Sequence, residues 1–201
     1  MGLNERVAEQ ARTPSGLFGR FIFWVMRHET AAENAGTVQL LDLQPTHRVL
    51  EIGFGHGRTL ATLARLVPDG LVAGVDPSEL MVRRATSQFG SRMELREGSS
   101  SNLPFPAANF DCVFSVHTVY FWADPASDLR EIRRVLRSGG KLVLAFRAKA
   151  DALAAGKYPT TIYRFFEEDD WKRWATDAGF TSVDFRRERV GKREMTWMIA
   201  A

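Results

Sequence analysis

A glycine-rich segment in the first half of the chain has the residue types and spacing needed to hold a nucleoside. Glu51 lies within an apolar run that contains β-branched residues, and Gly53, Gly55 and Gly57 follow it at alternate positions. Glycine lets a backbone approach a ligand where a Cβ atom would clash. Asp76 follows Gly57 by nineteen residues, and an acidic residue at such a distance accepts hydrogen bonds from ribose in nucleotide-binding βαβ units. The spacing predicts a nucleoside-binding site.

The positions of the glycines and of the acidic residue before them indicate which nucleoside is bound. The dinucleotide fingerprint G-x-G-x-x-G is matched only in part, because Arg58 occupies the place of its third glycine. A carboxylate buried in a strand is costly unless a cationic or hydrogen-bonding group meets it. Glu51 would repel a pyrophosphate, whereas the ammonium group of an amino acid would suit it.

The order of motifs along the chain resembles that of the class I S-adenosylmethionine-dependent methyltransferases, in particular the broad group that contains quinone- and sterol-type enzymes. The pattern E-x-G-x-G-x-G at 51–57 is similar to the first motif of that family, and Val-Asp-Pro-Ser-Glu-Leu-Met at 75–81 is similar to the second. Later segments that resemble the family lie at 98–106, 110–115, 129–144 and 178–180. The likeness therefore runs from about residue 40 to the C-terminus, and an ordered set of motifs is more specific than a single glycine loop.

The resemblance implies S-adenosylmethionine as the cofactor and S-adenosylhomocysteine as its product. It also implies roles for single residues: Asp76 would accept hydrogen bonds from the ribose, and Met81 would pack near adenine. Ser99 stands where the family usually has an acidic residue for the adenine amino group, and a hydroxyl accepts a hydrogen bond without charge assistance. The expected cofactor-binding residues are Glu51, Gly53, Gly55, Gly57, Asp76, Pro77, Met81, Ser99, Ser100 (through its backbone N–H) and Ser115.

Methyl transfer from a sulfonium is a displacement, so the protein has mainly to align the nucleophile and exclude water. A general base is needed only where the nucleophile arrives protonated. His117 follows the predicted strand at 110–116 and is the candidate base, because a histidine pKa of about 6.5 suits proton removal at neutral pH. A structural hydrogen bond from its ring is the competing interpretation. The expected substrate-pocket residues are Trp24, Tyr120, Trp122, Tyr158 and Tyr163.

Missing motifs narrow the class of acceptor. The predicted fourth strand is not followed by the [D/N]-P-P-[Y/F] signature of enzymes that methylate amino groups of DNA bases, and Cys112 lacks the preceding proline of the cytosine-C5 enzymes. Basic residues alternate with acidic ones and the net charge is only +3, so we expect no nucleic-acid partner. No His, Cys and carboxylate residues have metal-ligand spacing, so we expect no metal. A small-molecule substrate is the remaining expectation.

The elements that must position these residues alternate along the chain. Strands are expected at 48–53, 71–75, 93–97, 110–116 and 141–146, and helices at 57–67, 77–89, 125–137 and 167–178. This alternation is typical of a parallel sheet with helices on both faces, and 181–187 and 193–200 are expected to form an antiparallel hairpin. Together with the resemblance, the pattern predicts a Rossmann-like α/β fold with a mostly parallel, seven-stranded sheet. Ligands of such sheets lie beyond the carboxyl ends of the strands.

The N-terminal residues have a different composition. We expect a helical cap at 1–39 before an S-adenosylmethionine-binding domain at 40–201. Residues 17–27 are apolar except for a stripe with Arg20 and Arg27, and the run is shorter than the roughly 20 apolar residues that span a bilayer. A helix packed on the domain as a cap is favoured over contact with a membrane surface. A single cysteine and a polar N-terminus without a signal-peptide pattern favour a cytoplasmic location.

Two other functions are compatible with these residues. A methyltransferase-fold module could bind the cofactor without turnover, since the acidic residue is missing at position 99. An NAD-dependent oxidoreductase is the second alternative, and Arg58 in place of the third glycine argues against it.

Overall fold

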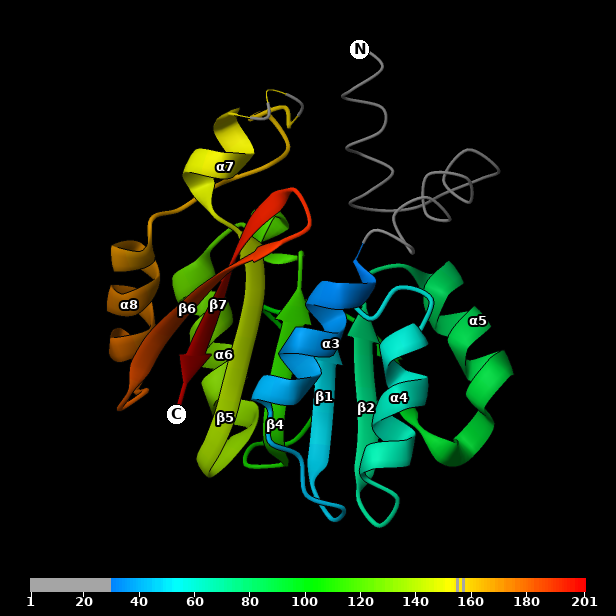
Figure 1. Ribbon diagram of the computed structural model, residues 1–201. Helices are drawn as coiled ribbons and strands as arrows, with labels where there is room; N and C mark the ends of the chain where they lie inside the picture. The colour runs from blue at the N-terminus through cyan, green and yellow to red at the C-terminus, as the bar shows by residue number, and fades with distance from the viewer. Residues whose placement is uncertain (1–29, 155, 157) are drawn as a thin grey trace.

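The structure is a computed structural model that describes residues 30–154, 156 and 158–201. Within these residues, seven strands form one sheet with the order β3-β2-β1-β4-β5-β7-β6 (Figure 1). The strands are β1 (Arg48–Ile52), β2 (Leu71–Asp76), β3 (Glu94–Glu97), β4 (Phe110–Val116), β5 (Leu136–Arg147), β6 (Val183–Val190) and β7 (Arg193–Ala200). The helices are α3 (Ala31–Leu40), α4 (Arg58–Leu66), α5 (Glu79–Phe89), η1 (Gly90–Arg92), η2 (Val119–Phe121), α6 (Pro125–Val135), α7 (Lys149–Ala154) and α8 (Glu168–Asp177).

The sheet is parallel except at its C-terminal hairpin. β1 pairs in parallel with both β2 and β4, and Glu51 near the end of β1 lies between Gly74 and Phe114. β7 inserts antiparallel between β5 and β6. The chain leaves β1 toward β2 and β3 on one side and returns to β4 on the other, so the strand order reverses between β1 and β4. Ligands bind at such a switch point in open α/β sheets. The predicted fold class is confirmed.

Neighbouring residues of a strand point to opposite faces of the sheet. Because the central strands carry apolar side chains on both faces, helices cover both. In β1, Leu50 belongs to the hydrophobic cluster under α6 and α8, which contains Ile132 and Trp171. Val49, one residue earlier, belongs to the cluster under α4 and α5, which contains Leu63 and Phe89. Figure 1 shows α3, α4 and α5 together on one face. Apolar runs such as that of β1 are therefore buried on both faces.

Two elements differ from expectation. β5 begins at Leu136, five residues before the expected start at 141. Gly139 has a φ of +72°, and the pairing with β4 shifts in register between residues 110 and 112, so the strand continues through an irregular segment. The short helix α7 at 149–154 was not expected.

Helix α3 lies at the end of the predicted N-terminal cap and docks on the sheet. The indole Nε1–H of Trp197 donates to Thr37 Oγ1 at 2.9 Å. Gly36 leaves room for the same ring, since a Cβ atom there would lie 3.3 Å from it. The predicted helix at 17–27 and Trp24 lie outside the described residues, and the division of the chain at residue 39 stays a prediction. No helix among the described residues is long and apolar enough to span a membrane.

Candidate cofactor and acceptor site

The loops that carry the expected cofactor-binding residues begin at one edge of the sheet. β1, β2, β3 and β4 are parallel neighbours, so their carboxyl ends lie along the same edge, and the loops that follow begin there. At this edge the Gly53 N–H donates to Val75 O at 2.7 Å, and the Gly98 N–H donates to Asp76 O at 3.2 Å. His117 follows the end of β4. The expected convergence of the loops at the carboxyl ends is confirmed.

The glycine loop needs glycine for conformation and for packing. Gly53, Gly55 and Gly57 all have positive φ, at 75°, 55° and 75°. A Cβ atom at Gly53 would lie 2.4 Å from Thr118 Cγ2, and one at Gly57 would lie 2.8 Å from the ring of Phe89. The loop therefore passes tightly between the start of α4, the end of α5 and the segment after β4.

Asp76 is held rigidly at the end of β2. Its Oδ2 accepts from the Gly55 N–H at 2.8 Å, and its Oδ1 accepts from the Ser78 N–H at 2.9 Å. The residue is only 6% exposed, and burial raises the pKa of its carboxyl, against the two backbone hydrogen bonds that lower it. Each carboxylate oxygen keeps acceptor capacity beyond one hydrogen bond, so a ribose diol could still be bound.

Glu51 carries an unusual buried carboxyl. It is 5% exposed, and among the described residues its Oε2 has no hydrogen-bond partner. Burial raises its pKa to about 8; a hydrogen bond from Thr59 opposes this shift, and the charge of Asp76 adds to it. A buried acceptor without a partner costs free energy unless a ligand satisfies it. The ligand group that fits this position is a cationic hydrogen-bond donor, such as an ammonium group.

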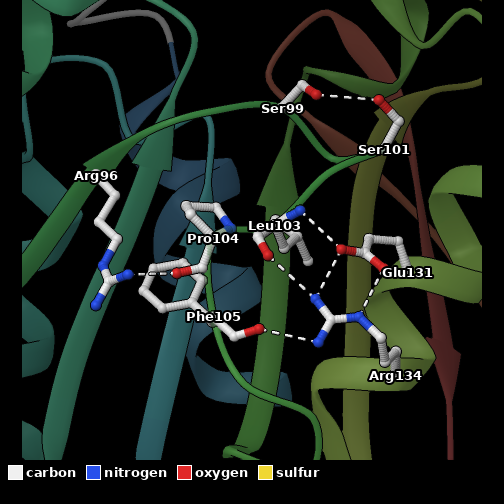
Figure 2. A network of polar contacts seen from close by, with 8 residues as sticks. All are labelled: Arg96, Ser99, Ser101, Leu103, Pro104, Phe105, Glu131 and Arg134. Atoms are coloured by element: carbon white, nitrogen blue, oxygen red, sulfur yellow. Dashed lines mark hydrogen bonds and ion pairs between the residues drawn. The ribbon is translucent and has the colours of Figure 1, made fainter.

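The loop after β3 is clamped onto helix α6 (Figure 2). Glu131 Oε1 accepts from the Leu103 N–H at 2.8 Å, and Arg134 donates to Leu103 O at 3.1 Å and to Phe105 O at 2.9 Å. Ser99 is exposed at the start of this loop, where its Oγ lies 3.0 Å from Ser101 Oγ. The clamp fixes the backbone that would face adenine.

Ser100 belongs to the same loop but is buried, and its side chain is hydrogen-bonded to Asp128 of α6. Burial raises the pKa of Asp128 to about 6, against the hydrogen bond from Ser100, and the charge of Asp124 adds to the shift. The expected contact of the Ser100 backbone N–H with adenine stays a prediction.

The other expected cofactor residues differ in exposure. Met81 is 1% exposed and packs in the cluster with Phe54 and Phe89, while Pro77 is exposed. Ser115 is fully buried, and its hydroxyl donates to Ile52 O at 2.7 Å. That hydroxyl joins the ends of β1 and β4, so a contact of Ser115 with a cofactor would involve its backbone.

An aromatic cluster forms around Tyr120, which lies shortly after β4. Tyr120 lies with ring centroids 5.8 Å from Tyr163 and 5.2 Å from Phe165, and Tyr158 lies 5.2 Å from Tyr163. These are normal distances for packed aromatic rings. The ring of Trp122 packs instead against Trp171, with centroids 5.9 Å apart. The structure thus brings together three of the expected pocket residues and separates Trp122 from them.

His117 joins this cluster to the end of β4. Its φ is +60°, which is uncommon outside glycine, although histidine is enriched among the exceptions. Its Nδ1 lies 3.0 Å from Tyr120 Oη. Burial lowers the pKa of the imidazole to about 4, and the charges of Arg193 and Arg147 add to this shift.

Several residues of the site were not predicted. Thr118 packs over Gly53, Phe165 extends the aromatic cluster, and Arg147 donates to Tyr158 Oη at 2.8 Å. The one indication for Arg147 in the sequence is a charged residue directly after the apolar strand 142–146, the same pattern that identified Asp76. No pattern in the neighbouring sequence identified Thr118 or Phe165 as residues of the candidate site.

A parallel sheet with this strand order, a glycine loop after β1 and an acidic residue at the end of β2 defines a Rossmann-like domain that holds a nucleoside cofactor. Comparison with known proteins narrows this class. The family model described as a methyltransferase domain matches residues 50–144. The uncharacterized methyltransferase YdaC of Bacillus subtilis is 30% identical over 131 residues, which are 64% of this chain and 72% of YdaC.

Other similar proteins are also methyltransferases by name. The chloroplastic 2-methyl-6-phytyl-1,4-hydroquinone methyltransferase of Arabidopsis thaliana is 29% identical over 153 residues, 71% of this chain and 43% of that protein. The crystal structure of a SAM-dependent methyltransferase from Aquifex aeolicus shares the fold, with a TM-score of 0.69, 24% identity, and coverage of 83% of this chain and 88% of that one. This chain belongs to the S-adenosylmethionine-dependent methyltransferases. It spans less than half of some relatives, 34% of a 37.1 kDa transposon protein of Streptomyces fradiae among them.

Proposed function

We propose that this protein transfers a methyl group from S-adenosylmethionine to a small molecule by direct displacement. The observation that carries the proposal is the pair of buried carboxyl groups at the ends of β1 and β2. Glu51 has a buried oxygen without a partner among the described residues, and Asp76 is fixed by two backbone N–H groups. An ammonium group and a ribose diol complement these two acids, and S-adenosylmethionine carries both.

The chain's own residues would then hold the cofactor from several loops. The glycine loop gives close backbone approach, and the clamped loop after β3 presents Ser99 and the Ser100 N–H toward adenine. Pro77, Met81 and Ser115 are proposed to line the same site. When bound, the cofactor supplies a methyl group that is already activated on a sulfonium, so alignment and exclusion of water are the tasks left to the protein.

The aromatic cluster is proposed to receive the acceptor. Tyr120, Tyr158 and Tyr163 pack with Phe165 at the side of the sheet where β4 ends. Aromatic side chains give large apolar contact with a polar handle, which suits a small, largely apolar ring compound. One relative is named for a hydroquinone substrate, and a ring acceptor of that chemical kind agrees with the cluster. His117 contacts Tyr120 of this cluster, and the next residue, Thr118, packs against Gly53 of the glycine loop.

The first experiment is calorimetric titration with S-adenosylhomocysteine, with NADH titrated in parallel. We expect binding of S-adenosylhomocysteine alone, and a loss of affinity of about 10-fold or more in Asp76→Ala, because two ribose hydrogen bonds to a charged acceptor are removed. Asp69→Ala is the control, since Asp69 is an exposed carboxylate before the start of the same strand. Binding of NADH without S-adenosylhomocysteine would favour the oxidoreductase alternative.

A second titration tests the assignment of Glu51. Glu51→Gln is expected to weaken S-adenosylhomocysteine about 10- to 100-fold through loss of a charge-assisted contact. The same variant should bind 5′-methylthioadenosine as the wild type does, because that ligand has no ammonium group. Equal losses for both ligands would place Glu51 away from the amino-acid end.

Turnover is tested with radiolabelled S-adenosylmethionine and a panel of phenols and quinols. Transfer of label to any member supports the proposal. Binding of the cofactor without transfer to any acceptor would favour the cofactor-binding module.

A further inference from the structure

We propose that His117 is a hydrogen-bond donor to the methyl acceptor, held in that form by Tyr120, and that it selects acceptors with a phenolic oxygen on the ring. This inference rests on the proposed function, because it assigns an acceptor class to that site. In this assignment His117 recognises the acceptor by donating a hydrogen bond to it, and does not act as a general base.

The position of the proton follows from the partners of Tyr120. The backbone N–H of Arg147 donates to Tyr120 Oη at 2.5 Å, and His117 Nδ1 lies 3.0 Å from the same oxygen. The phenol can donate one hydrogen bond, and of these two partners only Nδ1 can accept it. If the imidazole donated instead, Tyr120 would accept twice and its own hydrogen would remain buried without an acceptor. Nδ1 is therefore the acceptor.

The imidazole is neutral and so carries its one hydrogen on Nε2. Burial is the main reason that its pKa falls to about 4, and the charges of Arg193 on β7 and Arg147 on β5 oppose protonation further. These cations are themselves paired, Arg147 with Asp151 and Arg193 with Glu33. Burial also raises the pKa of Tyr120 well above its ordinary value, so the phenol keeps its hydrogen.

The Nε2–H group has no hydrogen-bond partner among the described residues, and its nitrogen is buried. Most buried polar groups are paired, and an exception calls for a functional explanation. The ring is held in place by the hydrogen bond to Tyr120 and by a backbone with φ +60°, and such strained positions are common at ligand sites. A ligand oxygen is the partner that would satisfy this donor.

In the proposed complex, two ligand oxygens could accept from this donor: the carboxylate of the cofactor and an oxygen of the acceptor. The surroundings of His117 favour the acceptor. Its ring is stacked with Tyr120 at a centroid distance of 6.0 Å, and Tyr120 leads on to Tyr163 and Phe165. A donor at the edge of an aromatic cluster suits the oxygen of a phenol or quinol that is bound as its anion. A base is not required where such an acceptor arrives as the anion.

The tautomer is tested by NMR of protein labelled with ¹⁵N-histidine, which needs no ligand. The His117 resonance is assigned by its absence in His117→Gln. We expect the Nε2–H tautomer, with no titration between about pH 5.5 and 8, and a partial shift to the Nδ1–H tautomer in Tyr120→Phe. The Nδ1–H form in the wild type, or titration at the ordinary histidine pKa, would overturn the proposal even if the cofactor binds normally.

The ligand is tested on the same sample by adding S-adenosylhomocysteine, then phenols or the methylbenzenes of matching shape. We expect the NMR resonance of the Nε2 proton to shift only with the phenols. It should shift with 4-methylphenol, for example, but not with p-xylene. A shift with S-adenosylhomocysteine alone would make the cofactor carboxylate the partner, and no shift with any phenol would also refute the acceptor assignment. Absence of calorimetric binding of S-adenosylhomocysteine would instead refute the proposed function.

Variants separate a donor from a base. Gln reaches about as far as Nε2 and donates a hydrogen bond, but it is not basic. With an acceptor that turns over, His117→Gln should keep kcat within about threefold, while His117→Phe should lose about 10-fold or more of kcat/KM. Equal loss in both variants, with a wild-type rate that depends on a group titrating at neutral pH, would restore the general base.

Discussion

Thr118 lies directly over Gly53: a Cβ atom added to the glycine would sit 2.4 Å from Thr118 Cγ2. The hydroxyl of Thr118 also contacts Ser115 Oγ at 2.5 Å, and Ser115 is tied to Ile52 O. The loop proposed to hold the cofactor and the segment proposed to face the acceptor are therefore packed as one unit. A shift of either would move the other, which matters for a displacement that depends on alignment.

Gly53→Ala should destabilise the protein by about 2–4 kcal/mol, because it combines a left-handed backbone with overpacking. Gly191→Ala is the matched control, since Gly191 has φ +61° but nothing within 4 Å of its would-be Cβ. Urea unfolding should show that the control loses only about 1–2 kcal/mol. Thr118→Ala in the Gly53→Ala background should recover part of the difference, and equal losses at both glycines would contradict this packing.

Glu51 gives the unfolding free energy a pH dependence of defined sign. Its folded pKa, raised to about 8, exceeds the ordinary value of 4.5, so its stabilising contribution is complete below 4.5 and is lost as pH rises to about 8. Glu51→Gln stays neutral and should exceed the wild type in stability by on the order of 2–4 kcal/mol near pH 9. Denaturant unfolding of the ligand-free protein at several pH values measures this, and parallel curves for both proteins would refute it.

Much of this arrangement could be predicted because it is encoded locally. The expected strand at 48–53 is β1 at Arg48–Ile52, and the acid that ends the next strand is Asp76 at the end of β2. Apolar runs, glycines and a charged residue after a strand are visible within a few positions. The same holds for the hairpin, where β6 and β7 meet at Gly191.

What could not be predicted depends on contacts between distant segments. How Met81 packs depends on the contact between helix α5 and its neighbours, and in the structure Met81 is buried with Phe89; its place near adenine stays a prediction. The hydrogen bond that sets the tautomer of His117 runs through Tyr120 to a backbone N–H in β5. No pattern within a single element reveals it.

The clamp between α6 and the loop after β3 should matter for both stability and cofactor affinity. Arg134→Met removes hydrogen bonds to Leu103 O and Phe105 O and the pair with Glu131. Because Arg134 is partly exposed, we expect a loss of only about 1–2 kcal/mol in unfolding free energy, with S-adenosylhomocysteine binding weakened about 3- to 10-fold. Arg130→Met is the control, since its exposed side chain donates within the helix to Ser127. The same loss in both variants would show that the clamp is dispensable.

Ser99→Asp should strengthen cofactor binding, because it places a carboxylate where the family usually has one for the adenine amino group. Ser99 is exposed and its hydroxyl contacts only Ser101 among the described residues, so the change disturbs no buried contact. A charge-assisted hydrogen bond in place of a neutral one predicts a gain of about 3- to 30-fold in affinity for S-adenosylhomocysteine. The gain should vanish with S-inosylhomocysteine, whose ring has an oxygen in place of the amino group, and Ser101→Asp should show no gain with either ligand. Calorimetry with both ligands decides the matter: an equal gain for the two would mean that the new carboxylate acts by general charge and not on adenine.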